Sequence, residues 1–110
     1  QLSLIGDGHH LPVALIRTLL TVKGAEKLML VSDASPLCGC PPGYYQLWGA
    51  AVHLAEDGSL RNPETGYCCG SAYSLSQCVA MLSQQETFDN RLLNQLASQN
   101  PQALLQAYSR

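Results

Sequence analysis

Two short apolar runs of the sequence each lead into an acidic residue. Residues 2–5 are followed by Asp7, with His9 and His10 close behind, and residues 27–31 are followed by Asp33. If both runs are neighbouring parallel strands, these side chains meet at one edge of the sheet, where ligands bind in such folds. Carboxylates and imidazoles gathered there could move protons or bind a polar ligand. An aspartate after a strand is also a common turn or helix cap, so this second interpretation stays open for both acids.

The two adjacent histidines are expected to differ in role. In extended chain consecutive side chains point to opposite sides, so only one of them should face the strand ends. We favour His10, which is nearer the start of the following helix and could donate a hydrogen bond or offer a positive charge to an anionic ligand. His9 and His53 are expected to be surface imidazoles.

A turn with the sequence Tyr-Cys-Cys-Gly-Ser precedes a later apolar helix pattern. Gly70 could let the backbone approach a ligand closely, and Ser71 could cap the helix. A nucleophilic role for Ser71 is disfavoured because the strand, Gly-x-Ser-x-Gly and helix arrangement is missing. Cys68 and Cys69 carry no local signature of a nucleophile.

The five cysteines favour a reduced, cytoplasmic setting, because the number is odd and the first residues have no basic flank or cleavage site. A zinc site would use Cys38, Cys40, Cys68 and Cys69. Paired zinc ligands are usually separated by two to four residues, but only one residue separates Cys38 from Cys40, and Cys68 and Cys69 are adjacent. Cys78 lies in an apolar helical pattern and is expected in the core.

The elements that must position these groups follow from periodicity. Residues 2–5 and 27–31 are expected strands, and apolar residues at helical spacing from Leu11 to Gly24 predict the helix between them. This is a parallel crossover unit. Such strands need helices on both faces and neighbours at each edge, so we interpret the chain as a piece of a larger domain or as a unit that assembles with copies of itself.

The rest of the chain predicts a hairpin and helices. Residues 44–48 and 50–54 alternate, and Asp57-Gly58 turns the chain toward Leu60. Helices are expected over 75–82, capped by Ser71 or Ser74, from about Phe88, and again from Asn100-Pro101.

Composition limits the partners. The chain has 110 residues, of which 46% are hydrophobic and 13% charged, and its net charge of −2 suits one globular domain. No apolar run approaches the roughly 18–20 residues of a membrane helix. A membrane is therefore not an expected partner. The six Lys and Arg residues are spread singly and form no basic stripe, so nucleic acid is not an expected partner either.

Short motifs run in one order along nearly the whole chain. They are Asp7-Gly-His-His10, Ala14-Leu-Ile-Arg17, Lys23-Gly24, Leu30-Val-Ser-Asp33-Ala34, Pro42-Gly43-x-Tyr45, Asp57-Gly58, Gly70-Ser71 and Asn100-Pro101. In this order and spacing they resemble the N-acetylglucosamine-6-phosphate deacetylases of the amidohydrolase superfamily. The resemblance implies an α/β fold, the C-terminal part of a metal-dependent (β/α)₈ TIM barrel. Its last two parallel strands and their helices would form one partial domain over 1–110, with strand, helix, strand and loop in 1–43, a β-hairpin in 44–66 and helices in 67–110.

The resemblance also implies roles for particular residues. Asp33 matches the aspartate at the end of the last barrel strand, which accepts a proton from metal-bound water and passes one to the leaving amine. The residues that match substrate contacts are Asp7, Gly8, His10, Cys68, Cys69 and Gly70. The two cysteines depart from the small or apolar residues more typical at their positions.

The family's metal ligands, a Glu and two His on earlier strands, would lie upstream of Gln1, so this segment alone is expected to hold no metal and to be inactive. The complete enzyme would use zinc or a similar divalent ion. Expected partners are an amino-sugar phosphate and the remainder of the barrel or a second copy, in a homo-oligomer.

Two other functions stay open. One is a non-catalytic interaction domain derived from the barrel, which a start codon near Gln1 would favour, whereas upstream ligands would favour the enzyme. The other is a cysteine-based redox or metal module, which would need two cysteine Cα atoms within about 6 Å or four thiols in a tetrahedron.

Overall fold

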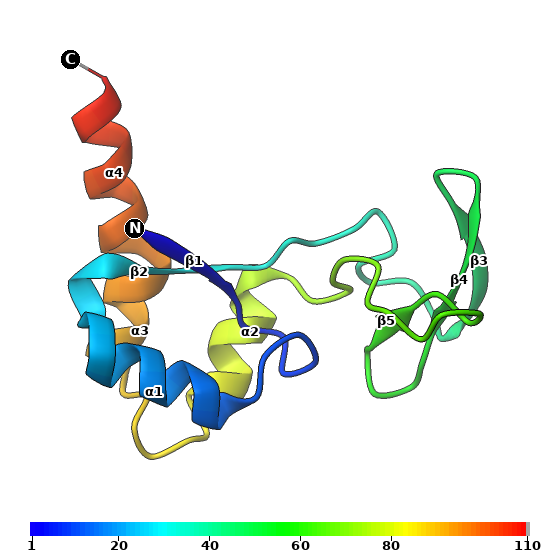
Figure 1. Ribbon diagram of the computed structural model, residues 1–110, viewed down its shortest axis with the longest axis horizontal. Coiled ribbons are helices and arrows are strands. Elements are labelled where there is room, and N and C mark those ends of the chain that lie inside the picture. Colours follow the sequence, from blue (N-terminus) through cyan, green and yellow to red (C-terminus); the bar gives the residue numbers. More distant parts are fainter. Residues whose placement is uncertain (110) are drawn as a thin grey trace.

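The computed structural model describes residues 1–109, which form two lobes (Figure 1). The larger lobe holds a pair of strands and all the α-helices, and the smaller lobe holds an antiparallel sheet. The larger lobe contains β1 (Leu2–Ile5), α1 (Val13–Lys23), the short 3₁₀ helix η1 (Ala25–Lys27), β2 (Leu28–Val31), α2 (Leu75–Leu82), α3 (Asn90–Asn94), the π-helical turn η2 (Gln95–Gln99) and α4 (Asn100–Tyr108). The smaller lobe contains β3 (Gly43–Leu47), β4 (Ala50–Leu54) and β5 (Leu60–Arg61).

Strands β1 and β2 are parallel neighbours, as the sequence predicts. Leu2 pairs with Leu28 and Ile5 with Val31, and α1 makes the crossover between the strands. Leu28 and Leu30 are buried against the helices, whereas Met29 and Val31, which alternate with them, are only partly buried. Within residues 1–109 the helices therefore bury one face of this sheet much better than the other.

The larger lobe has an apolar core to which every α-helix except α4 contributes buried residues. Its fully buried members come from β1, β2, α1, α2, η2, α3 and the segment before α3, and they are Leu4, Ile16, Leu28, Leu30, Cys78, Leu82, Phe88, Leu93 and Leu96. The expectation that Cys78 belongs to the core is confirmed. Helix α1 ends where Gly24 takes a φ of 85°, a conformation that glycine adopts without steric cost.

Helix α2 begins with a reciprocal cap. The Ser74 hydroxyl accepts from the Gln77 N–H, and the Gln77 side chain accepts from the Ser74 N–H. Ser74 is therefore the cap, and Ser71 is not.

The C-terminal helices differ from the expectation of separate segments. The helix begins at Asn90, with Asp89 rather than Phe88 at its start, and runs through α3, η2 and α4 to Tyr108 without a break. Pro101 would clash with the carbonyl four residues earlier in a regular α-helix, and a wider π turn immediately precedes it. No helix in residues 1–109 is long and apolar enough to cross a membrane.

The smaller lobe is a three-stranded antiparallel sheet with its own core. Tyr45 pairs with Val52, and Leu54 pairs with Leu60. The buried residues of this core are Leu37, Leu47, Val52, Leu54, Leu60 and Ala72. The predicted hairpin is thus confirmed, and the connection through Asp57-Gly58 adds a third strand to it.

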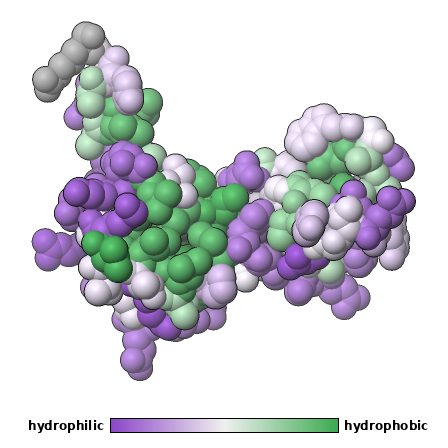
Figure 2. Space-filling model, in the orientation of Figure 1, coloured by the Kyte–Doolittle hydropathy of each residue, from purple (hydrophilic) through white to green (hydrophobic). Residues whose placement is uncertain are grey.

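The surface also distinguishes the lobes. Figure 2 shows a broad apolar area on the near face of the larger lobe, whereas polar residues dominate the junction with the smaller lobe. This junction contains the loops that follow β1 and β2. The polar groups identified in the sequence therefore lie where the two lobes meet.

Candidate functional site

Asp7 and Asp33 occupy equivalent places at the carboxyl edge of the parallel sheet. Each lies two residues beyond a member of the pair Ile5 and Val31, and the Gly6 N–H extends this ladder by donating to the Val31 carbonyl at 3.4 Å. The sequence prediction that these acids follow neighbouring parallel strand ends is confirmed. Their local environments, however, are very different.

The carboxylate of Asp7 organises the loop after β1. Its Oδ1 accepts from the N–H groups of His9 at 2.9 Å and His10 at 3.0 Å, and its Oδ2 lies 2.9 Å from His10 Nδ1. Burial would raise the pKa of Asp7, but the hydrogen bonds from His10 and His9 outweigh it and hold the pKa below its ordinary value. Asp7 is only 2% exposed and is ionised at neutral pH.

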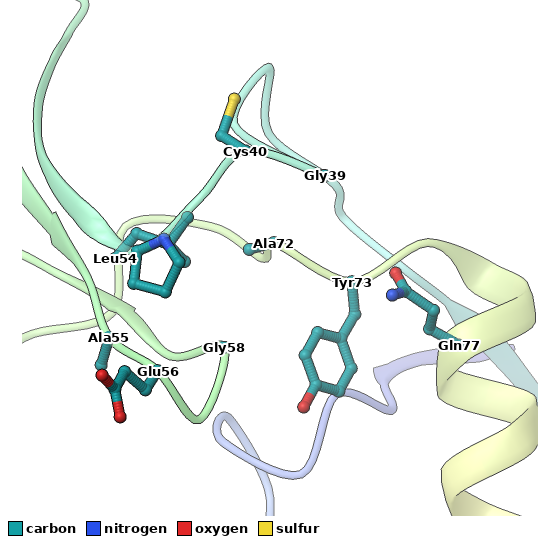
Figure 3. Close-up of a pocket in the computed structure, with 10 residues that line it drawn as sticks. Gly39, Cys40, Leu54, Ala55, Glu56, Gly58, Ala72, Tyr73 and Gln77 are labelled. Atoms are coloured by element: carbon teal, nitrogen blue, oxygen red, sulfur yellow. The ribbon is translucent and has the colours of Figure 1, made fainter.

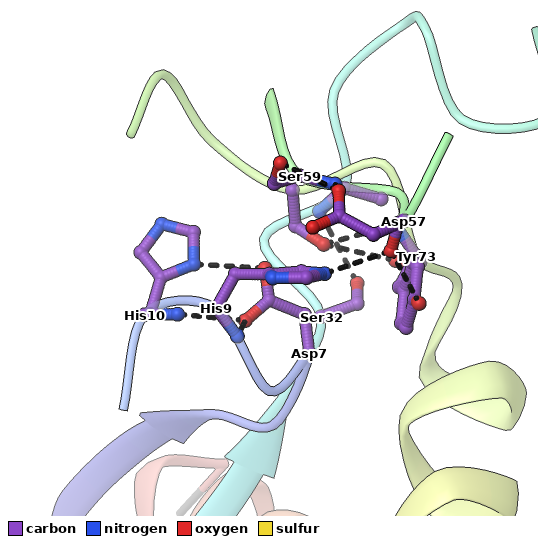
Figure 4. A network of polar contacts seen from close by, with 9 residues as sticks. Asp7, His9, His10, Ser32, Asp57, Ser59 and Tyr73 are labelled. Atoms are coloured by element: carbon purple, nitrogen blue, oxygen red, sulfur yellow. Dashed lines mark hydrogen bonds and ion pairs between the residues drawn. The ribbon is translucent and has the colours of Figure 1, made fainter. Parts of the chain in front are cut away.

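This turn corrects one premise of the sequence analysis. The segment around His9 and His10 is a bend, not extended chain, because the Asp7 side chain captures two successive backbone N–H groups. The rings still diverge: that of His10 turns back to Asp7, and that of His9 reaches toward the smaller lobe (Figure 4).

His9 is a partly exposed imidazole that makes contacts with the smaller lobe and with Tyr73. Its Nε2 lies 3.0 Å from the Asp57 carbonyl oxygen, which also accepts from the Tyr73 hydroxyl at 3.0 Å. The rings of His9 and Tyr73 meet edge to face, with centroids 5.8 Å apart. His9 is partly exposed, as expected, but its contacts come from residues far away in the sequence, which the sequence analysis did not anticipate. His53, by contrast, stacks on Tyr44 in the hairpin, with ring centroids 4.5 Å apart.

Asp33 is exposed and has a strained backbone. Its φ is 50°, which is uncommon for a residue with a side chain, and its carbonyl accepts from the Ser71 N–H at 3.0 Å. The Ser35 N–H donates to the Ser71 carbonyl at 2.7 Å, so residues 33–35 and 71 form a short parallel bridge. A Cβ on Gly70 would lie 3.7 Å from the Asp33 carbonyl oxygen. The structure thus brings Gly70 beside Asp33.

The two cysteines before Gly70 lie against β5. Cys68 bridges to Arg61, and the Cys69 N–H donates to the Leu60 carbonyl at 3.0 Å. Both side chains are partly buried, and the Cys69 thiol is 3.5 Å from the Tyr67 carbonyl. The backbone contacts of Cys68 and Cys69 are thus with the smaller lobe, while Asp7, Gly8 and His10 lie together in the loop after β1. Gly8 is exposed there with a φ of 82°.

A cavity of about 200 Å³ lies beside the junction of the lobes (Figure 3). Tyr73 and Gln77 line one side of it, and Leu54, Ala55 and Glu56 line the other. None of the predicted site residues lines this cavity. The cavity is therefore not the place where the sequence analysis locates the chemistry.

Residues 1–109 do not form a metal site on their own. Among residues 1–109, no group of three or more His, Cys, Asp and Glu side chains is arranged to hold a metal ion. All five cysteines carry free thiols.

Sequence reasoning missed Tyr73 and Asp57. No motif marks Tyr73, and Asp57 was identified only as part of a turn. Asp57 Oδ1 accepts from the Ser59 N–H at 2.9 Å and from the Ser59 hydroxyl at 2.7 Å. These bonds hold the pKa of Asp57 below its usual value. They also fix the turn whose carbonyl His9 and Tyr73 share.

Comparison with known proteins gives a consistent result. No protein-family model matches the chain. It is 32% identical over 82 residues to N-acetylglucosamine-6-phosphate deacetylase of Lysinibacillus sphaericus, a match that covers 74% of this chain and 21% of that protein. It is 33% identical over 78 residues to a putative N-acetylgalactosamine-6-phosphate deacetylase of Escherichia coli K12, covering 71% of this chain and 45% of that protein.

The fold agrees with the sequence comparison. The crystal structure of N-acetylglucosamine-6-phosphate deacetylase from Thermotoga maritima matches with a TM-score of 0.85 and 27% identity, covering 100% of this chain and 30% of that one. The matches therefore cover between 21% and 45% of the length of these relatives. The prediction drawn from the motifs is confirmed: over most of its length this chain is similar, in sequence and in fold, to a segment of the N-acetylglucosamine-6-phosphate deacetylases.

Proposed function

We propose that the chain is a segment of a deacetylase that hydrolyses N-acetylglucosamine 6-phosphate to glucosamine 6-phosphate and acetate. In this proposal residues 1–110 are one partial domain, the last two strands of a (β/α)₈ barrel with their helices and a hairpin insertion. The observation that carries it is the parallel pairing of β1 and β2, which puts Asp7 and Asp33 at one sheet edge in a chain similar to such enzymes. Cytoplasmic amino-sugar breakdown is the proposed setting.

Asp33 is the proposed proton carrier. Its carboxylate is exposed at the strand end, and a left-handed backbone conformation turns the chain there. In amide hydrolysis a base takes a proton from the attacking water, and the same group then protonates the amine nitrogen as the C–N bond breaks. An exposed aspartate held by its backbone rather than by its side chain is free to do both.

Asp7, Gly8 and His10 are the proposed substrate contacts of the first loop. The Asp7 carboxylate is hydrogen-bonded to His10 Nδ1, so Nε2 of the same ring remains available to a ligand. The His10 side chain is 19% exposed. A protonated His10 would donate from Nε2 to a phosphate oxygen, while the Asp7 carboxylate balances the charge. Gly70 is the proposed contact beside Asp33, with Cys68 and Cys69 as contacts through the preceding turn.

The proposed reaction depends on a divalent metal, zinc or a similar ion, which supplies an activated water in enzymes of this kind. Residues 1–109 form no group that could hold it. We therefore assign this chain the proton transfer and the substrate contacts only, and propose that the remainder of the barrel supplies the metal ligands. A homo-oligomer is the proposed assembly.

A graft tests this proposal. Residues 1–110 would replace the matching segment of the Thermotoga maritima enzyme, and acetate release would be measured with the 6-phosphates of N-acetylglucosamine and N-acetylgalactosamine. The graft should hydrolyse the first substrate, and Asp33→Asn should lower kcat by about 10²–10⁴-fold. Glu64→Gln, at an exposed turn of the smaller lobe, is the matched control and should retain activity.

Other outcomes count against specific parts of the proposal. An active graft that is indifferent to Asp33→Asn would remove Asp33 from the reaction, and a preference for the galactosamine substrate would change the proposed sugar. If the graft does not fold, the 110-residue chain still offers a test by NMR. N-acetylglucosamine 6-phosphate should then shift the resonances of His10 and Gly70, and unchanged spectra would contradict the proposed contacts.

A further inference from the structure

At the junction of the lobes, two side chains share one carbonyl group as hydrogen-bond acceptor. The Asp57 carbonyl oxygen lies 3.0 Å from His9 Nε2 and 3.0 Å from the Tyr73 hydroxyl. His9 belongs to the loop after β1, Asp57 to the turn between β4 and β5, and Tyr73 to the segment before α2 (Figure 4). Because a carbonyl can only accept, both side chains donate, and His9 must carry its proton on Nε2.

The contact is close as well as polar. Gly58 follows Asp57 with a φ of 86°, and a Cβ at this position would clash with the Tyr73 ring. The rings of His9 and Tyr73 pack edge to face, at an interplanar angle of 77°. Ring packing and two hydrogen bonds therefore hold the turn, His9 and Tyr73 together.

Tyr73 continues this connection to Asp33. The Tyr73 N–H donates to the Ser71 hydroxyl at 3.0 Å, and the Ser71 N–H donates to the Asp33 carbonyl at 3.0 Å. A left-handed backbone costs about 1–2 kcal/mol for a residue with a side chain, so its surroundings must hold it in place. For Asp33, a neighbour that bonds its carbonyl directly is Ser71, which is itself buried.

We propose that His9 is a positioning residue: through the shared Asp57 carbonyl and Tyr73 it holds Ser71 against Asp33 and fixes the backbone that carries the Asp33 carboxylate. The functional part of this inference rests on the proposed role of Asp33, whereas the structural part does not. The hydrogen bond between His9 and Asp7 involves the backbone N–H of His9, and the His9 side chain bonds to Asp57 instead. Substitutions of His9 can therefore leave the Asp7–His10 pair intact.

Amide hydrogen exchange at Ser71 tests the positioning without any turnover. His9→Phe keeps an aromatic ring but removes the donor, and Tyr73→Phe removes only the hydroxyl. Each should speed exchange at Ser71 about tenfold, the effect of losing one net hydrogen bond, while amides of α1 stay unchanged. His9→Gln restores a donor and should stay within about twofold of the parent chain.

His53→Ala is the matched control, because His53 stacks on Tyr44 within the hairpin and should not affect Ser71. Unchanged Ser71 exchange in His9→Phe would overturn the proposal. If that variant unfolds, so that α1 amides exchange as fast as Ser71, the histidine tautomer of the parent chain decides. NMR of the neutral His9 ring should find the proton on Nε2, and a proton on Nδ1 would overturn the proposal.

The two proposals can fail separately. In the active graft, His9→Phe should lower kcat with little change in KM, and His9→Gln should recover it. A Ser71 effect with no loss on Asp33→Asn would leave the positioning intact and refute the role of Asp33. The reverse pattern would refute the positioning alone.

Discussion

The side-chain amide of Asn100 donates a 2.6 Å hydrogen bond to the carbonyl of Leu28, the first residue of β2. The same Nδ2 lies 2.7 Å from the Ala25 carbonyl, and Asn100 is only 8% exposed. The start of α4 is thereby attached to the chain segment that enters the second strand of the parallel pair.

Asn100→Leu should lower the free energy of unfolding by about 2 kcal/mol, because two carbonyl groups lose their shared donor in a buried place. Urea denaturation followed by circular dichroism measures this. Asn94→Leu, an exposed position on the same run of helix, should change stability by less than about 0.5 kcal/mol. Equal losses in the two variants would contradict the assigned role of Asn100.

The Asp7 loop should make stability depend on pH. The folded pKa of Asp7 is lowered relative to an unfolded value of about 3.9, so its contribution is complete above about pH 5 and is lost as the pH falls below about 4. Asp7→Asn should lower the free energy of unfolding by about 2 kcal/mol at pH 7. It should also weaken the pH dependence of that free energy between pH 5 and 3, where the remaining dependence comes from Asp57. An unchanged pH profile of denaturation would contradict this assignment.

Cys78 should be chemically inert in the folded chain. Burial, reinforced by the negative charge of Asp7, raises the pKa of its thiol to about 11. At pH 8 its thiolate fraction is only about one in a thousand, and its side chain is fully buried. Iodoacetamide followed by peptide mapping should leave Cys78 unmodified in the native chain and label all five cysteines in concentrated guanidinium chloride. Rapid native labelling of Cys78 would show that α2 is not packed as described.

Gly58→Ala should destabilise the junction of the lobes more than Gly49→Ala does. The two glycines have similar φ values, 86° and 83°, but a Cβ at Gly58 would clash with Tyr73, whereas one at Gly49 meets nothing within 4 Å. Backbone strain should cost about 1 kcal/mol in both variants, and the clash should add about 1–3 kcal/mol in the first. Thermal denaturation compares them directly, and equal losses would mean that the Tyr73 ring gives way freely.

Local patterns predict the larger lobe well. The apolar runs before Asp7 and Asp33 form β1 and β2, and the segment with apolar residues at helical spacing forms α1. These elements are predictable because each type of secondary structure repeats its buried positions with a fixed period along the sequence. The Asp57-Gly58 turn is predicted by its Asp-Gly pair, which suits the backbone conformation of a tight turn. The continuous helix across Asn100-Pro101 was not, because a π turn before the proline has no periodic signal.

The contacts of the candidate site depend on distant residues. His9 and Asp57 are 48 positions apart, and Arg17 donates to Gln85 at 3.0 Å across 68 positions. Such pairings arise only when segments far apart in the sequence pack together, so periodicity cannot predict them. The equivalent places of Asp7 and Asp33 could be predicted, because strand direction alone determines them.

The two-stranded parallel sheet has a consequence for handling the protein. Within residues 1–109, β1 and β2 pair only with each other, so each has an outer row of backbone N–H and C=O groups, of which the Leu28 carbonyl is bonded to Asn100. Rows of this kind recruit strands from other molecules and seed aggregates. Purified alone at high concentration, the chain should polymerise through these rows, and a charged or proline residue placed along them should keep it dispersed.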